Sequence, residues 1–123
     1  MATANEIMTK EVASTTPSAD VWEVAHTLLK HGYGGMPVLG ENGELIGMIS
    51  GFDVISKRGQ TVGEIMSRGV VWANPTDTFE AVVQMMGLHG IRRIPVCENG
   101  ALVGIISRSD LLRYRTQAHD QKS

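Results

Sequence analysis

The 123-residue sequence predicts an α/β fold of the α+β type, in which a β-α-β-β-α unit occurs twice. One observation behind this prediction is an internal repeat: residues 6–9 (EIMT) return as 64–67 (EIMS), and residues 45–50 (LIGMIS) return as 102–107 (LVGIIS). The other is the spacing of apolar residues, which changes from a helical period to short strand-like runs at the same place in each copy. The duplication implies that any binding site comes in two related versions.

The repeat sets the predicted domain boundaries. Repeat 1 covers residues 1–59 and repeat 2 covers residues 60–118, followed by a polar tail at 119–123. A chain of about 60 residues buries too little apolar surface for a robust core of its own. We therefore expect the two repeats to form one module together.

Each repeat opens with a short strand, expected at 12–14 and at 70–73, and an amphipathic helix follows. Asp20 with Glu23, and Asp77 with Glu80, resemble an acidic capping box that marks the helix start. The apolar side of the helix is expected to consist of Val21, Val24, Ala25, Leu28 and Leu29 in repeat 1 and of Phe79, Val82, Val83 and Met86 in repeat 2.

The end of this helix is marked in both copies by His-Gly, at 31–32 and at 89–90. A cation in the last turn and a glycine just beyond it are typical of a helix C-terminus. A second helix is expected to begin near Ser50 and near Ser107, with Leu111 and Leu112 on its apolar side. Between the two helices, Glu-Asn-Gly predicts a tight hairpin whose strands lie at 36–39 and 45–49 in repeat 1 and at 94–97 and 102–106 in repeat 2.

Composition excludes several classes of function. The net charge of −2 gives no electrostatic reason to bind nucleic acid, and no apolar run approaches the roughly 20 residues that span a membrane. Cys97 is the only cysteine, which excludes an intrachain disulfide and fits a reducing, cytoplasmic location. The sequence has no recognisable pair of general acid and general base, so we do not expect an enzyme. No Cys or carboxylate cluster has the spacing of metal ligands, so we do not expect a metal site.

The motif Ser-x-x-Asp stands at the start of the second helix in both copies, as Ser50/Asp53 and Ser107/Asp110. Two interpretations stay open. Structurally, the spacing is close to a capping box, in which the serine bonds an amide of the first turn and the acid reaches back. Functionally, a carboxylate at this place can accept two hydrogen bonds from a vicinal diol such as ribose, and the helix N-terminus keeps it ionised.

The residues just before the Pro-Val strand differ between the copies. Repeat 2 has Arg92-Arg93 there, and a guanidinium can bind phosphate in a bidentate manner or simply lie solvated at the surface. Repeat 1 has Gly34-Gly35, which either let a ligand approach the backbone closely or merely shape a loop. Two identical sites are therefore not expected.

Taken together and in order, these motifs resemble a pair of cystathionine-β-synthase (CBS) domains, also called a Bateman module. The shared order is Ile-Met-Thr/Ser, Thr/Asn-Pro, helix, Pro-Val, Asn-Gly and Gly-x-x-Ser-x-x-Asp, and it covers roughly residues 4–115. Each motif alone is weak, whereas the duplicated order is specific. The resemblance implies two repeats related by pseudo-two-fold symmetry, with two clefts between their sheets.

The resemblance also implies which residues line each cleft. The Ser-x-x-Asp of one repeat holds the ribose, and the Thr-Pro approach and the segment before Pro-Val of the other repeat hold the base. The first cleft would use Thr16, Tyr33, Gly34, Gly35, Pro37, Ser107, Arg108 and Asp110. The second would use Ser50, Asp53, Asn74, Ile91, Arg92, Arg93, Ile94 and Pro95.

In function, the resemblance implies a regulatory module and not an enzyme. Its ligand would be an adenine nucleotide (AMP, ADP or ATP), with S-adenosylmethionine or NAD as alternatives, and no cofactor would be required. A homodimer and a regulated protein partner are implied as well. The open alternative is a dimerisation or protein-interaction module that acts without any ligand.

Overall fold

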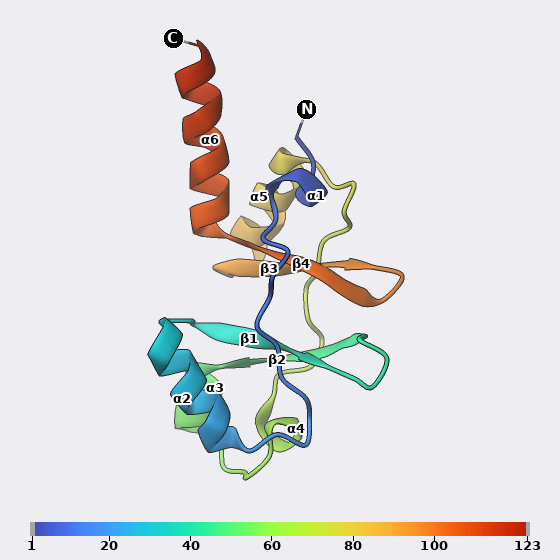
Figure 1. Ribbon diagram of the computed structural model, residues 1–123, viewed down its shortest axis with the longest axis vertical. Helices are drawn as coiled ribbons and strands as arrows, with labels where there is room; N and C mark the ends of the chain where they lie inside the picture. Colours follow the sequence, from blue (N-terminus) through green and yellow to red (C-terminus); the bar gives the residue numbers. More distant parts are fainter. Residues whose placement is uncertain (1, 123) are drawn as a thin grey trace. The chain divides into compact units, whose positions relative to one another are not determined.

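The computed structural model describes residues 2–122. The chain divides into two compact units. One unit is Ala13–Val70, and the other combines the N-terminal segment as far as Val12 with the chain from Val71 onward. Both units mix helices with a two-stranded antiparallel sheet, which confirms the predicted α+β fold (Figure 1).

The unit Ala13–Val70 is built around one hairpin. In chain order it contains α2 (Val21–His31), β1 (Gly35–Leu39), β2 (Leu45–Ser50), α3 (Gly51–Ser56) and α4 (Val62–Ile65). The two strands pair with Met36 opposite Ile49. Figure 1 shows α2 and α3 side by side, in agreement with the contacts between them, and α3 also contacts β2.

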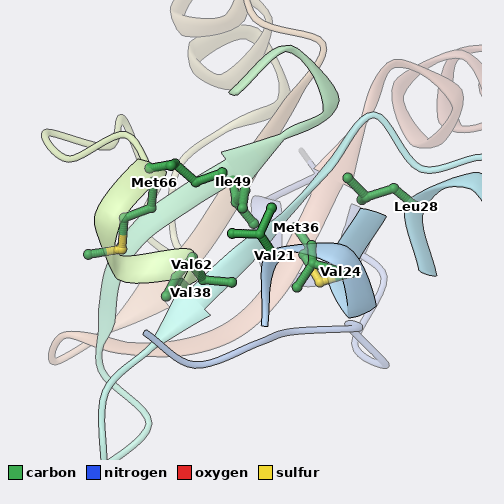
Figure 2. Close-up of a cluster of buried hydrophobic side chains, with 9 residues drawn as sticks. Val21, Val24, Leu28, Met36, Val38, Ile49, Val62 and Met66 are labelled. Atoms are coloured by element: carbon green, nitrogen blue, oxygen red, sulfur yellow. The ribbon is translucent and has the colours of Figure 1, made fainter. Parts of the chain in front are cut away.

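The core of this unit lies where α2 and α4 pack on one face of the hairpin (Figure 2). Strand side chains alternate between the two faces of a sheet. Residues 36 and 38 of β1 therefore share a face, and Ile49 of β2 joins them. The buried cluster consists of Val21, Val24, Leu28, Met36, Val38, Ile49, Val62, Ile65 and Met66.

The second unit repeats this plan. Its elements are α1 (Ala4–Ile7), α5 (Phe79–His89), β3 (Arg93–Glu98), β4 (Ala101–Ser107) and α6 (Arg108–Lys122). Ile94 pairs with Ile106 across the hairpin, and the ring of Phe79 lies 4.9 Å from that of Tyr114 on α6. The buried cluster consists of Ala4, Ala73, Val82, Met86, Ile94, Val96 and Ile106.

Each compact unit takes one segment from the other sequence repeat. Thr9, which follows α1 in repeat 1, exchanges two backbone hydrogen bonds with Ile105 of repeat 2, at 2.8 and 2.9 Å. Ser67, which follows α4 in repeat 2, does the same with Met48 of repeat 1, at 2.8 and 3.0 Å. We call residues 8–9 and 66–67 the crossing segments. The compact units are therefore bounded differently from the sequence repeats.

A glycine makes room for each crossing segment. A Cβ atom on Gly47 would lie 2.8 Å from the sulfur of Met66 and 3.0 Å from the carbonyl oxygen of Ser67. Gly104 has the same relation to Met8. These contacts explain why the strand that leads into Ser-x-x-Asp carries glycine in both copies.

The local signals for helix ends are confirmed in both copies, and the tight Asn-Gly turn is confirmed in repeat 2; in repeat 1 a longer loop, 40–44, joins β1 to β2, and of its Asn-Gly pair only Gly43 has a positive φ. Gly32 and Gly90 end α2 and α5 in the left-handed conformation, with φ of 68° and 62°. The hairpin between β3 and β4 turns on Asn99 and Gly100, whose φ values of 53° and 82° are both positive. Two positive φ values in a two-residue loop are typical of a type I′ turn, which matches the twist of the strands.

The short strands expected before the first helix of each repeat do not form. A single parallel bridge forms instead: in one unit it joins Val38 to Thr15, the residue just after 12–14, and in the other it joins Val96 to Ala73, the last residue of 70–73. Proline follows two residues after each bridge and has no N–H to donate, so the pairing ends there.

One of the two predicted helix starts is wrong. Asp20 is the N-cap of α2, and its side chain accepts a 2.7 Å bond from the amide of Trp22. The N-cap of α5, however, is Thr78, whose hydroxyl accepts from the amide of Ala81 at 3.1 Å. Asp77 instead accepts from the amide of Asn74 at 2.8 Å and closes the preceding turn. Threonine and aspartate are both good N-cap residues, so the sequence alone did not decide whether Asp77 or Thr78 begins the helix.

Three of the predicted apolar positions face solvent: Leu29, Leu112 and, in part, Val83. The segment expected to be a polar tail, 119–123, continues α6 as far as Lys122, and residue 123 lies outside the described residues. Polar residues such as glutamine and lysine are good helix formers, so a polar composition does not end a helix.

Candidate functional site

Both Ser-x-x-Asp motifs form a capping box at the helix that follows. The amide and the hydroxyl of Ser50 donate to Oδ2 of Asp53 at 2.9 and 3.0 Å, and the amide of Asp53 donates back to the Ser50 hydroxyl at 3.1 Å. Ser107 and Asp110 make the same three bonds at 2.9, 3.1 and 3.3 Å. The structural interpretation of the motif is therefore confirmed. It also fixes the orientation of each carboxylate.

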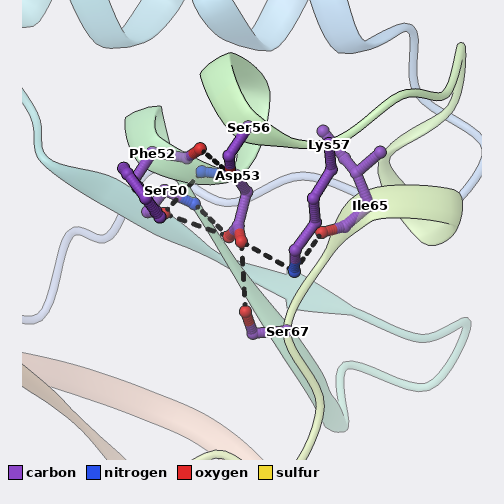
Figure 3. A network of polar contacts seen from close by, with 7 residues as sticks. All are labelled: Ser50, Phe52, Asp53, Ser56, Lys57, Ile65 and Ser67. Carbon is purple, nitrogen blue, oxygen red and sulfur yellow. Dashed lines mark hydrogen bonds and ion pairs between the residues drawn. The ribbon is translucent and has the colours of Figure 1, made fainter.

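The other oxygen of Asp53 contacts two groups from outside the motif (Figure 3). The Ser67 hydroxyl donates to Oδ1 at 3.2 Å, and Nζ of Lys57 lies 2.9 Å from the same atom. Lys57 also donates to the carbonyl oxygen of Ile65 at 3.1 Å. A crossing segment and a cation at the C-cap of the motif's helix thus meet at one carboxylate oxygen.

Asp110 has an equivalent pair of partners on Oδ1. The Thr9 hydroxyl donates at 3.1 Å, and Nη1 of Arg113 donates at 3.0 Å. Thr9 comes from the N-terminal crossing segment, as Ser67 comes from the other. The two repeats therefore hold their aspartates in the same way, with lysine in one copy and arginine in the other.

The two aspartates are the buried charged residues of the described chain, with 5% of Asp53 and 6% of Asp110 exposed. A buried carboxylate is tolerated only when it is paired and hydrogen-bonded. Burial by itself would raise the pKa of Asp53. The hydrogen bond from Lys57, the bonds from the amide and hydroxyl of Ser50 and the positive charge of Lys57 together outweigh burial and hold that pKa below its ordinary value of 3.8.

This pKa has a consequence for stability. The Asp53 carboxyl binds its proton less tightly in the folded chain than in the unfolded chain, so its contribution to folding is complete above about pH 5 and is lost as the pH falls through the folded pKa. We expect Asp53→Asn to lower the free energy of unfolding at pH 7 and to lower it much less at pH 3. Urea unfolding at the two pH values measures the difference. An equal loss of unfolding free energy at pH 7 and at pH 3 would contradict the charge assigned to Asp53.

The residues before Pro-Val lie beside the start of Ser-x-x-Asp within the same unit. Gly35 pairs with Ser50 across the hairpin, and the carbonyl oxygen of Gly34 accepts from the amide of Gly51 at 3.1 Å. A Cβ on Gly35 would lie 2.7 Å from the carbonyl oxygen of Ile49, so the sheet itself requires glycine at this position. This contact favours the structural interpretation of the glycine pair over ligand access.

The other copy has the same backbone arrangement with different side chains. Arg93 pairs with Ser107 across the hairpin, and the amide of Arg108 donates to the carbonyl oxygen of Arg92 at 3.1 Å. Arg92 and Arg108 are exposed and Arg93 is half-buried. Three arginines thus lie close along the backbone where β3 begins and β4 ends.

The remaining predicted site residues differ in exposure. Thr16 and Asn74 are exposed, and Ile91 is half-buried. The exposed ring of Tyr33 stacks on His31, with 5.2 Å between ring centroids. Pro37, Ile94 and Pro95 are fully buried. Each cleft implied by the resemblance takes residues from both compact units, so its assembly stays a prediction.

Sequence reasoning missed the four groups that contact Oδ1 of the two aspartates: Lys57, Arg113, Ser67 and Thr9. The two cations follow their aspartates by four and three positions, which is the spacing of ion pairs on a helix and could have been recognised. The two hydroxyls end the duplicated motif at 6–9 and 64–67. The recurrence of a hydroxyl residue at this position indicated a shared role. It did not identify the aspartate that each hydroxyl contacts, because that aspartate belongs to the other repeat.

Among residues 2–122, no three His, Cys, Asp or Glu side chains gather closely enough to hold a metal ion. In the same part of the chain, no helix combines the length and the apolar character needed to cross a membrane.

Comparison with protein families finds the CBS domain twice, at residues 4–59 and 62–116. A CBS domain-containing protein of Bacillus subtilis, YhcV, is 36% identical over 118 residues, which cover 90% of this chain and 84% of that protein. Some relatives are much longer. The zinc metalloprotease MJ0392 of Methanocaldococcus jannaschii is 40% identical over 110 residues, but the chain spans only 31% of its length.

Solved structures share the fold. CBSX2 in complex with AMP has a TM-score of 0.90 at 23% identity, and the match covers 95% of this chain and 98% of that one. The CBS domain pair of protein MJ0100, in complex with 5′-methylthioadenosine and S-adenosyl-L-methionine, has a TM-score of 0.84 at 26% identity, again with 95% and 98% covered.

Proposed function

This chain belongs to the CBS domain family and carries two copies of the domain, and from that premise we propose that it is a regulatory module that binds an adenosine-containing ligand. The observation that carries the proposal is the pair of aspartates at equivalent places in the two units, each buried and fixed by a capping box. A carboxylate whose orientation is already fixed can accept a hydrogen bond from each of the two hydroxyls of a ribose.

The ligands of a similar structure support this chemistry. The MJ0100 pair holds 5′-methylthioadenosine and S-adenosyl-L-methionine. These molecules differ at the 5′ position and have in common an adenosine whose 2′ and 3′ hydroxyls are free. A site that grips the diol accepts both. For this chain we infer a ligand of the same class, with AMP, ADP and ATP as the first candidates.

In the proposed site, Asp110 and Ser107 hold the ribose of one ligand, with Thr16, Tyr33 and the segment 34–37 around its base. Asp53 and Ser50 serve a second ligand, with Asn74 and the segment 91–95 around its base. The exposed guanidinium groups of Arg92 and Arg108 are suited to a phosphate, because guanidinium matches its geometry. A ligand that prefers one state of the module would then pass its signal to a partner protein.

A thermal-shift panel tests this function. AMP, ADP, ATP, S-adenosylmethionine and NAD are each added to the full chain, with inosine monophosphate as a control for the adenine base. A ligand at 100 times its dissociation constant stabilises the folded chain by about 2.7 kcal/mol, which is readily measured. A shift with at least one adenosine compound is expected. No shift with any of them would favour a module that acts without ligand.

We also infer that the chain forms a homodimer through α2 and α3. These neighbouring helices expose large apolar side chains at helical spacing: Trp22 and Leu29 on α2, and Phe52 and Ile55 on α3, each at least 63% exposed. The equivalent positions in repeat 2 are Glu80, Gly87, Ser109 and Leu112. A second copy of the chain would remove this apolar surface from water.

Light scattering during gel filtration tests the dimer. We expect the wild-type chain to elute at twice the mass of one chain, and Ile55→Glu to elute as a monomer, because a buried unpaired carboxylate is costly. Leu88→Glu is the matched control, since Leu88 is 79% exposed on α5, which belongs to the other compact unit. A monomeric wild-type chain would contradict the proposal.

A further inference from the structure

The two aspartates have no free acceptor position for a ligand. A carboxylate can accept about four hydrogen bonds. Asp53 receives the amide and hydroxyl of Ser50 on Oδ2, and the hydroxyl of Ser67 and the ammonium of Lys57 on Oδ1. Asp110 is filled in the same way. A diol that donates two hydrogen bonds must therefore displace two of these donors.

The donors on the two oxygens differ in how easily they leave. Those on Oδ2 are the backbone and side chain of the N-cap serine, which are fixed by the helix start. Those on Oδ1 are the end of a long cationic side chain and a hydroxyl from a crossing segment. The Lys57 side chain is 44% exposed and that of Arg113 is 60% exposed, so each cation can swing into water and stay solvated. We call the cation and the hydroxyl on Oδ1 the Oδ1 pair.

We propose that the Oδ1 pair sets the ligand affinity of each aspartate, because a ribose diol binds there only by displacing the cation and the hydroxyl. This inference rests on the proposed function and adds residues to its site. Lys57 and Ser67 compete with the ligand at Asp53, and Arg113 and Thr9 compete at Asp110. Each released hydroxyl belongs to a crossing segment, so ligand binding also loosens a tie between that segment and the helix that carries the aspartate.

The proposal predicts that removing Lys57 or Arg113 changes ligand affinity in the opposite direction from the loss of an ordinary binding residue. Removing a cation that touches a ligand-binding carboxylate should raise affinity, whereas a merely structural role would leave affinity unchanged or lower it. Because the cations are largely exposed, we use the range for surface ion pairs, about 0.2–1 kcal/mol, and expect the affinity of one site for adenosine to rise by up to about fivefold. Losing the hydroxyl as well removes a second competitor, and the rise should approach about tenfold.

Titration calorimetry with adenosine tests the proposal on the full chain. The variants are Lys57→Met and Arg113→Met, each alone and combined with Ser67→Ala or Thr9→Val. Arg58→Met and Arg115→Met are matched controls that remove a neighbouring cation outside the network. 2′-Deoxyadenosine is the ligand control, because it displaces only one donor and should gain less from each variant.

A rise in adenosine affinity at either site, absent from the controls and abolished by adding Asp53→Asn or Asp110→Asn, is the expected result. Unchanged or reduced affinity in both cation variants, while wild type binds adenosine and the aspartate variants do not, would overturn this inference and leave the proposed function intact. No adenosine binding by any form would overturn both. Circular dichroism establishes that each variant is folded, and the two repeats give two independent trials.

Discussion

Replacing Asp110 by asparagine is expected to abolish most of the affinity for an adenosine ligand while the chain stays folded. The asparagine oxygen can still accept from the amide of Ser107 and preserve the helix start. The negative charge that would receive the diol is lost. Hydrogen bonds to a charged group contribute about 1.5–3 kcal/mol, so the dissociation constant of that site should rise by at least about tenfold. Calorimetric titration with AMP measures it.

The matched control for this variant is Asp120→Asn, which removes a carboxylate from the same helix ten residues beyond the motif. Asp53→Asn reports the other site in the same assay. If Asp110→Asn and Asp53→Asn both bind AMP as tightly as wild type does, the aspartates do not hold the ribose. If Asp110→Asn unfolds the chain, the capping role of this residue dominates its contribution.

Truncation of Ile106 to alanine is expected to be among the most destabilising single changes in the chain. This side chain is fully buried between α5 and the β3–β4 hairpin, and it immediately precedes Ser107 of the capping box. Loss of a buried isoleucine to alanine costs about 2–5 kcal/mol, because contacts are lost and a cavity remains. Urea unfolding of the free chain measures the change, and ligand affinity at Asp110 should fall with it.

Leu88→Ala is the control for this core variant. It removes an aliphatic side chain of similar size that is 79% exposed on α5, and surface changes of this kind stay within about 0.5 kcal/mol. Equal losses of stability in the two variants would contradict the assignment of the core.

The parts of the fold that the sequence predicted are those set by local chemistry. His-Gly ends a helix because glycine accepts the left-handed conformation at Gly32 and Gly90. Asn-Gly closes a hairpin for the same reason at residues 99–100. Ser-x-x-Asp forms its capping box from groups three residues apart. In each case the interacting groups lie within one turn of chain, so their spacing in the sequence is their spacing in space.

What the sequence did not predict depends on long-range contacts. Thr9 reaches Asp110 from 101 residues away, and nothing in either motif alone indicates that pairing. The strand expected at 12–14 has suitable residues, but only the neighbouring Thr15 finds a partner, on β1. Leu112 fits a helical apolar pattern, yet which residues of α6 are covered depends on what packs against it.

In the candidate site, too, local features were predicted and long-range contacts were not. The oriented carboxylates of Asp53 and Asp110 were predicted from the motif, because the capping geometry that orients them is local. Their competitors on Oδ1 were not predicted, although the spacing of Lys57 from Asp53 is that of a helical ion pair. Residues such as Tyr33 and Arg92 remain proposals, since their role depends on a ligand that brings both repeats together.

A crystal structure of the chain grown with adenosine tests the central claim most directly. We predict that the 2′ and 3′ hydroxyls of the ribose lie within hydrogen-bonding distance of the carboxylate of Asp53 or Asp110, with the cation of that aspartate displaced from Oδ1. A bound adenosine whose hydroxyls contact neither aspartate would contradict the claim, as would a fully bound ligand beside an aspartate that keeps all four of its present donors.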